Sequence, residues 1–485
     1  MSTTAKRNGT VDLTQGNLLK QILLFTLPII ATGVLQLLFN TADLIIVKSA
    51  SETASGAVSA THALNNLTIN LIMGISIGAG VLVARYFGAN DKQGLYEVVH
   101  TSFPTAIIGG FAFGAIGFIF ARPLLELFNT PANMIDQSVT YIRIIFCGVP
   151  FNVVYNFGAS ILRSVGNAKK PLLYLTIAGI TNVALNSFFV FVCKLDVEGV
   201  ALATIMSQLL SAILVVCQLT KVDGPHKLVL KEMKIYPKQL KNMIRIGLPA
   251  GIQGAMFSIS NIIIQSSVNS FDYLVVTANG AAHNIEGYVY TCMNSFHQTA
   301  VAFTGQHIGA KKEKRIWKIC LTCASCVITV GLVLGTSAYL LGEPLLKMLI
   351  NKNIVEQAME FGLLRLSIIG TTYFLCGAMD VMCGMLRGMG KSTIPMIITV
   401  LSVCGTRILW IFTVFAQNHA LDILYMSYPI SWGICVLIEA TLFVVIYAKM
   451  MKKNQKRKRD FPNNGACKII NRENLFSYRN RGVLL

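Results

Sequence analysis

Long apolar stretches separated by short polar ones run through the whole chain. Each apolar stretch has about twenty residues or more, the length at which a helix crosses a bilayer. Lipid admits only helices and closed barrels, and barrel strands would be about half as long and would alternate polar with apolar residues. The pattern therefore predicts helices. Twelve spans are expected, at residues 18–43, 55–84, 97–121, 136–162, 171–193, 197–220, 243–270, 276–308, 316–341, 355–386, 394–417 and 423–449.

Lys and Arg gather in every second connection between these spans. The rich connections are 85–92, 163–170, 221–245, 311–318 and 387–391, together with both chain ends, and the poor ones hold only Lys48, Arg122, Lys194, Lys347 and Lys352. Basic residues favour the cytoplasmic side. We therefore expect a multi-pass protein of the cell membrane with both termini in the cytoplasm. The basic run after the last span is expected to contact anionic lipid.

Composition agrees with a membrane protein. The 485 residues are 54% hydrophobic and only 13% charged, with a mean hydropathy of +0.60, whereas soluble domains carry roughly 25% charged residues. The net charge of +19 follows from the basic connections, so no nucleic-acid partner is expected. Cys320, Cys323 and Cys326 have the spacing of a metal motif, but they lie in an apolar run without His or acid. We expect them to pack, with no metal and no cofactor.

The chain contains two copies of one pattern. At an offset of 221 residues, Leu27-Pro28 corresponds to Leu248-Pro249 and Asn40 to Asn261. Six spans per copy is an even number, so the copies share one orientation, as in transporters built from parallel repeats. The predicted fold is an all-α polytopic membrane protein with twelve transmembrane helices in two six-helix lobes related by a parallel internal repeat. The expected segments are an N-terminal tail (1–17), a first lobe (18–220), a linker (221–242), a second lobe (243–450) and a basic tail (451–485).

Polar residues in the first lobe form a possible cation site. Gln36, Asn40 and Asp43 are spaced four and three apart and share one helix face. Asn182 and Asn186 are stacked in the fifth span, and Thr204 lies in the sixth. A dehydrated cation needs several oxygen ligands and one negative charge, which this set supplies. The alternative is that the two amides only hold helices together.

Other first-lobe residues are candidates for substrate contact and for movement. Gln36, Asn40, Tyr155 and Asn156 are expected to line a substrate cavity. Pro28 removes one hydrogen bond from the first helix, so it is the expected hinge. Neutralising Asp43 is expected to shift that bend and to weaken the hold on a cationic substrate.

The second lobe has its own polar residues. His283, Glu286 and His297 fall near one face of the eighth span, and Asp380 lies in the tenth. His283, Glu286 and Asp380 are candidates for the substrate cavity. The alternative for both acids is pairing with a buried base such as Arg365 or Arg407. A substrate role for Arg143, Arg365 or Arg407 would favour anions, and Glu439 has no assigned role.

Several stretches resemble the multidrug and toxic compound extrusion (MATE) transporters, bacterial type. They include LPIIATGVLQLLFNTADLIIV, INLIMGISIGAGVLVARYFGANDK and CGAMDVMCGMLRGMGKSTIPM, and the resemblance covers roughly residues 15–450. It implies rocking-lobe export of organic cations or drugs in exchange for Na⁺ or H⁺. It also implies that Asp43, Asn182, Asn186 and Thr204 bind the coupling ion.

Two residues depart from the family pattern. Some members have Asp at the position of Asn186, which leaves both Na⁺ and H⁺ coupling open, and the family usually has Gly at the position of Lys48. We expect a transporter that acts as a monomer rather than an enzyme, since no cluster of acids, His or metal ligands lies at one interface. The alternative function is a lipid-linked or polar-metabolite flippase of the same superfamily.

Overall fold

The computed structural model describes residues 11–50, 56–59, 61–127, 130–132 and 134–460, and their regular structure is helical throughout. The long helices of the first half are α1 (Leu18–Ala50), α3 (His62–Gly88), α4 (Lys92–Leu127), α5 (Ile135–Ser164), α6 (Lys169–Ser187) and α7 (Val197–Lys221). A π-helical turn, η1 (Phe188–Val192), extends α6, and η2 (Leu230–Glu232) lies in the connection to the second half.

The second half starts at Pro237, which occupies the first helical position, where a missing N–H costs nothing. Its long helices are α8 (Pro237–Val268), α9 (Tyr273–Gly309), α10 (Lys314–Leu340), α13 (Thr371–Gly388) and α16 (Leu421–Asp460). Shorter pieces are α11 (Gly342–Leu349), α12 (Val355–Arg365), η3 (Leu366–Gly370), α14 (Thr393–Thr399), η4 (Val400–Gly405), α15 (Thr406–Trp410) and η5 (Ile411–Phe415). The expected spans 355–386 and 394–417 are therefore each built from α-helical pieces that are joined end to end by π-helical turns.

The predicted all-helical membrane fold is confirmed. Eleven helical segments in the described residues are long and apolar enough to span a membrane. The remaining expected span, 276–308, coincides with α9, which has 37 residues but carries polar and ionisable side chains along its length. Several of these side chains are buried, among them Asn279, Glu286 and His297, whereas His283 is exposed. The polarity of α9 thus reflects contacts inside the protein.

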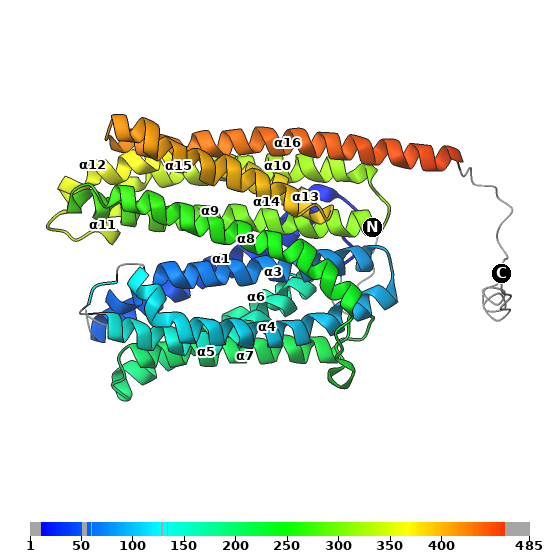
Figure 1. Cartoon of the computed structure of the whole chain (residues 1–485), viewed down its shortest axis with the longest axis horizontal. Coiled ribbons are helices and arrows are strands. Elements are labelled where there is room, and N and C mark those ends of the chain that lie inside the picture. The colour runs from blue at the N-terminus through cyan, green and yellow to red at the C-terminus, as the bar shows by residue number, and fades with distance from the viewer. Residues whose placement is uncertain (1–10, 51–55, 60, 128–129, 133, 461–485) are drawn as a thin grey trace, which may run out of the picture. The chain divides into compact units, whose positions relative to one another are not determined.

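The chain divides into two compact units, residues 1–440 and 441–485. The first lobe (18–220) and residues 243–440 of the second lobe lie in the first unit. Figure 1 shows the helices α1 to α7, coloured blue to teal, gathered in one bundle, and the helices α8 to α15, coloured green to orange, gathered in another.

Glycines let the two halves approach each other closely along α3 and α8. A Cβ added to Gly74 would lie 2.2 Å from the Cα of Gly251, and one added to Gly78 would lie 2.3 Å from the carbonyl oxygen of Met243. Asn70 of α3 donates a hydrogen bond to Ser258 of α8 at 3.0 Å. The run MGISIGAG (residues 73–80) therefore serves small-residue helix packing, as its composition predicts.

The segment before α1, residues 11–16, also bridges the halves. The backbone N–H of Leu13 donates to Gln306 Oε1 at 3.0 Å, and Gln306 Nε2 donates to the carbonyl oxygen of Ser164 at 2.8 Å. Arg315 donates to the carbonyl oxygen of Thr14 at 2.6 Å. Leu13 is buried, so this short segment is anchored to α5, α9 and α10 rather than extending freely from α1.

Candidate functional site

Asp43 lies two turns before the end of α1 and meets α6. Asn186 Nδ2 donates a hydrogen bond to Asp43 Oδ1. The same amide group donates to Asn182 Oδ1 at 3.3 Å. Both asparagines are buried, and Asp43 is partly buried. The structure thus brings together three of the four predicted ion-binding residues, because the four-residue spacing places both amides on the face of α6 that packs against α1.

The hydroxyl of the fourth residue, Thr204 of α7, has a hydrogen-bond partner in its own helix. Its hydroxyl donates to the carbonyl oxygen of Val200 at 2.9 Å, which leaves the oxygen lone pairs as acceptors only. Asn186 Oδ1 is buried and has no hydrogen-bond partner in the described part of the chain. A carboxylate and two amide oxygens suit a proton or a small hard cation. No group of three His, Cys, Asp or Glu side chains that could hold a metal ion gathers within the described residues.

The other first-half candidates do not join this cluster. Gln36 and Asn40 are exposed on α1. Tyr155 donates to the carbonyl oxygen of Pro171 at 3.4 Å, and Asn156 donates to Asn152 Oδ1, one turn earlier in α5, at 2.8 Å. The two residues on α5 therefore have structural partners, while the two on α1 remain available to a ligand.

Pro28 lies inside α1, which continues without a break through it. The hydroxyl of Thr32 donates to the carbonyl oxygen of Pro28 at 2.7 Å. Proline lacks the N–H that would donate to the carbonyl oxygen one turn earlier. The Thr32 hydroxyl adds a hydrogen bond one turn after Pro28 and does not replace the missing one. The hinge remains a prediction.

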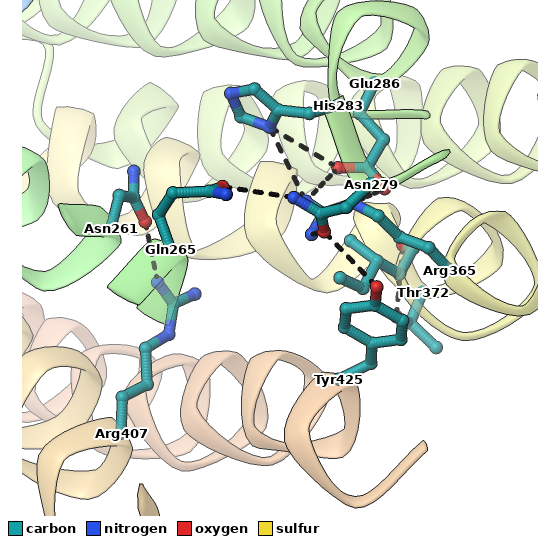
Figure 2. Close-up of polar contacts among 10 residues, drawn as sticks. Asn261, Gln265, Asn279, His283, Glu286, Arg365, Thr372, Arg407 and Tyr425 are labelled. Carbon is teal, nitrogen blue, oxygen red and sulfur yellow. Dashed lines mark hydrogen bonds and ion pairs between the residues drawn. The ribbon is translucent and has the colours of Figure 1, made fainter. Parts of the chain in front are cut away.

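A buried ion pair occupies the second half (Figure 2). Arg365 Nε donates to Glu286 Oε1 at 3.0 Å, and its Nη2 donates to Glu286 Oε2 at 2.7 Å. Arg365 Nη1 donates to Asn279 Oδ1 at 2.7 Å, and the Tyr425 hydroxyl donates to the same oxygen at 3.3 Å. His283 stands at the edge, with its side chain 61% exposed. Glu286 thus follows the alternative of pairing with a buried base, and His283 alone of this group faces outward.

Arg407 of α15 is the second buried arginine of this half, and it contacts α8 and α16. Its Nη1 donates to Asn261 Oδ1 at 3.3 Å and its Nε donates to Ser431 Oγ at 3.2 Å. The guanidinium lies 4.1 Å from the ring centre of Tyr428 and 5.7 Å from that of Trp432. Arg407 therefore does not pair with either acid for which the sequence suggested it as a partner.

Asp380 is buried in α13, beside a polar chain that crosses several helices. His297 Nδ1 donates to the carbonyl oxygen of Asp380 at 2.7 Å, and Arg387 Nη1 donates to His297 Nε2 at 3.1 Å. Arg387 Nη2 donates to Gln253 Oε1 at 2.7 Å. This backbone contact fixes the tautomer of His297, with a proton on Nδ1 and an acceptor at Nε2.

The same chain continues to Glu439 of α16. Gln253 Nε2 donates to Thr399 Oγ1 at 3.0 Å, and Thr399 donates to Glu439 Oε1 at 3.1 Å. Asp380 Oδ2 and Glu439 Oε2 have no hydrogen-bond partner among the described residues. Gln253 and Arg387 were not among the predicted site residues. A glutamine inside an apolar span is a signal that could have identified Gln253.

Arg387 corrects the loop assignment made from charge counting. The sequence places it in a basic connection, but it lies in the last turn of α13 and is buried. The physical reason is that its guanidinium turns back toward α8 and α9, where Gln253 and His297 accept its hydrogen bonds.

Comparisons with known proteins agree with this architecture. The MatE family model matches residues 28–188 and 249–413. The two matches begin 221 residues apart (249 − 28), the offset found in the sequence, which confirms the repeat. The chain is 29% identical over 397 residues to the probable multidrug resistance protein YpnP of Bacillus subtilis, covering 81% of this chain and 87% of that protein. It is 22% identical to a protein of Shewanella oneidensis named FAD transporter, over 64% of this chain and 70% of that protein.

Solved structures give the same fold. A structure described as an outward-facing conformation of a multidrug resistance MATE family transporter superposes with a TM-score of 0.85 at 19% identity, covering 92% of this chain and 99% of the other. A MATE crystal structure in complex with MaL6 gives a TM-score of 0.85 at 19% identity, with coverages of 91% and 99%.

Proposed function

The chain belongs to the MatE family, and from this premise we propose that it is a secondary active antiporter that exports organic cations or drugs in exchange for Na⁺ or H⁺. It is a polytopic membrane protein and a transporter rather than an enzyme. Relatives named multidrug resistance proteins support the substrate class. We propose that it acts as a monomer in the cell membrane, with both termini in the cytoplasm.

The observation that carries the proposal is the contact between Asp43 and Asn186. An acid in a membrane span is costly and usually functional. Asp43 forms no ion pair in the described part of the chain, so a proton, Na⁺ or a cationic substrate is needed to neutralise it. Gln36 and Asn40 are exposed on the same helix, seven and three residues before Asp43, so the polar surface continues along α1 from the acid.

Exchange follows from competition for one charge. When Asp43 is ionised, it attracts the cationic substrate. Binding of H⁺ or Na⁺ at Asp43, with oxygens from Asn182 and Asn186, removes that attraction and releases the substrate. Two lobes that rock about a central site can carry out these steps on opposite sides of the membrane. A bend at Pro28 is the proposed link between neutralisation of Asp43 and movement of α1.

The second candidate is export of a polar metabolite, the class of substrate that the relative named FAD transporter supports. It would use the same lobes and the same coupling site. The two candidates differ in the charge of the transported molecule, not in the mechanism of exchange.

The test uses purified protein in vesicles loaded with a fluorescent organic cation. Efflux is measured under an inward Na⁺ gradient and, separately, under an inward H⁺ gradient. We expect one gradient to drive wild-type transport and Asp43→Asn to abolish it. Asp196→Asn is the matched control, because Asp196 is exposed and its side chain makes no capping hydrogen bond at the start of α7. Wild-type rates in Asp43→Asn, or no response to either gradient, would refute the antiporter proposal.

A further inference from the structure

Arg407 is a buried cation with no acid beside it. Its residue is 2% exposed, and its hydrogen-bond acceptors are the neutral side chains of Asn261 and Ser431. No ion pair to Arg407 occurs among the described residues. Arg365, by contrast, is matched by Glu286. An uncompensated charge inside a membrane protein is costly, and such charges commonly mark substrate pathways.

The guanidinium is held in a fixed plane. Tyr428 and Trp432 of α16 place their rings 4.1 and 5.7 Å from it, and Ser431 of the same helix accepts the hydrogen bond from Nε. Stacking on aromatic rings fixes the orientation of the donor fork while leaving its outer N–H groups directed along the plane. Nη1 at that outer end points to Asn261, as Figure 2 shows.

Asn261 links this cation to the surface of α8 beside the first half. It is exposed on α8. Ser258, nearly one turn before it, bonds across to Asn70 of the first half, so Asn261 stands at the edge of the contact between α3 and α8. Gln265, one turn further, and His283 of α9 are also exposed. These residues form a polar wall with Arg407 directly behind Asn261.

The repeat gives this position a counterpart of opposite charge. Asn261 corresponds to Asn40 at the 221-residue offset. Asn40 is exposed on α1, three residues before Asp43. The equivalent asparagines thus lie three residues before a carboxylate in the first half and in hydrogen-bond contact with a guanidinium in the second.

We propose that Arg407, with Asn261 and Ser431, is a subsite for a carboxylate group of the substrate, and that the transporter favours amphoteric molecules over purely cationic ones. The carboxylate takes the place of Asn261 Oδ1 as acceptor for Arg407, while the cationic group of the same molecule faces Asp43. Charge-assisted hydrogen bonds from a planar guanidinium are the strongest way to recognise a carboxylate. This inference rests on the proposed function, because it concerns the substrate of the same transport cycle.

The test compares rhodamine B, which carries a free carboxylate and a delocalised cation, with rhodamine B ethyl ester, which lacks the carboxylate charge. Binding of each dye to the purified transporter is measured by fluorescence polarisation. Wild type is expected to bind the acid about tenfold more tightly than the ester, the value of one good charged hydrogen bond. Arg407→Met is expected to abolish this preference.

Asn261→Asp is the second variant, and it tests the carboxylate subsite even if Arg407→Met does not fold. It keeps Arg407 but supplies a carboxylate of its own at the exposed position, and it should abolish the preference for the acid. Asn418→Asp adds the same charge at an exposed position three residues beyond η5, and it should retain the preference. Equal binding of acid and ester by wild type, or a preference that persists in Arg407→Met or Asn261→Asp, would overturn the subsite.

Transport of the two dyes separates this inference from the proposed function. If an ion gradient drives efflux of the ester but the acid has no advantage, the antiporter stands and the subsite falls. If no gradient moves either dye, the antiporter proposal fails, and the binding comparison still decides whether Arg407 recognises a carboxylate.

Discussion

The pair formed by Glu286 and Arg365 allows a quantitative prediction. The two side chains meet through two hydrogen bonds of 3.0 and 2.7 Å. Glu286 is 1% exposed and Arg365 is 2% exposed. Glu286→Gln keeps the size of the side chain but leaves the positive charge of Arg365 buried without a partner. Removing one member of a buried pair costs about 3–5 kcal/mol, so this variant should lose that much free energy of unfolding.

The reverse substitution should cost less. Arg365→Met leaves Glu286 buried, but a carboxylate can take up a proton and become neutral, whereas a guanidinium cannot lose one. In the double variant no charge remains, and replacing a whole buried pair is often close to neutral. Glu286→Gln with Arg365→Met should therefore be more stable than Glu286→Gln alone by about 2 kcal/mol or more.

The assay is unfolding of the purified protein by SDS in mixed micelles, applied to wild type, both single variants and the double variant. His283→Ala is the control, since its exposed ring lies 3.9 Å from Glu286 Oε2 and exposed contacts contribute about 1 kcal/mol or less. A loss below about 1 kcal/mol for Glu286→Gln, or a double variant equal to the sum of the singles, would refute the argument from an uncompensated charge.

Two further predictions concern contacts between the halves. Gly74→Leu should separate α3 from α8, because even a Cβ would lie 2.2 Å from the Cα of Gly251; its melting temperature in detergent should fall well below that of Gly109→Leu, where a Cβ meets no other atom within 4 Å. Gln306→Ala should free the N-terminal segment, since it removes the acceptor for the N–H of Leu13. Amide hydrogen exchange at residues 11–16 should then rise by at least about tenfold, the effect of losing roughly 1.4 kcal/mol, while exposed Gln15→Ala, tied to Asp12 alone, should change it little. Unchanged exchange in Gln306→Ala would show that Lys312 and Arg315, which both donate to the carbonyl oxygen of Thr14, hold the segment without it.

The membrane explains why so much of the fold could be predicted. Every span must be helical and long, so the apolar runs locate the helices, and the position of Pro28 relative to Pro249 reveals the repeat. Lateral contacts follow less directly. Helical spacing places Gln36, Asn40 and Asp43 on one face, yet only Asp43 reaches α6, while the other two are exposed. Which residue on a face meets a neighbour depends on how the helices cross, and one sequence does not contain that information.

Pairings between distant residues were the least predictable part of the site. Glu286 and Arg365 are 79 residues apart, and the sequence offered Arg365 and Arg407 as equal partners for two acids. The structure assigns Arg365 to Glu286 and places Arg387, counted as a loop residue, near Asp380. Charge alternation identifies the side of the membrane for a basic connection, but it does not reveal a guanidinium at a helix end that folds back into the protein.

The two halves share a scaffold and differ in charge, which bears on how one site serves two ligands. Asp43 has no basic partner in the described residues, and Arg407 has no acidic one. Burying either charge alone is unfavourable, so under the proposals above each half would be stabilised by a ligand of the opposite sign. A proton or Na⁺ satisfies only Asp43, whereas a molecule with both charges satisfies both halves when they are close enough to share it. The coupling ion would then compete with only one end of such a substrate, and its arrival would loosen the substrate from the first half before the second.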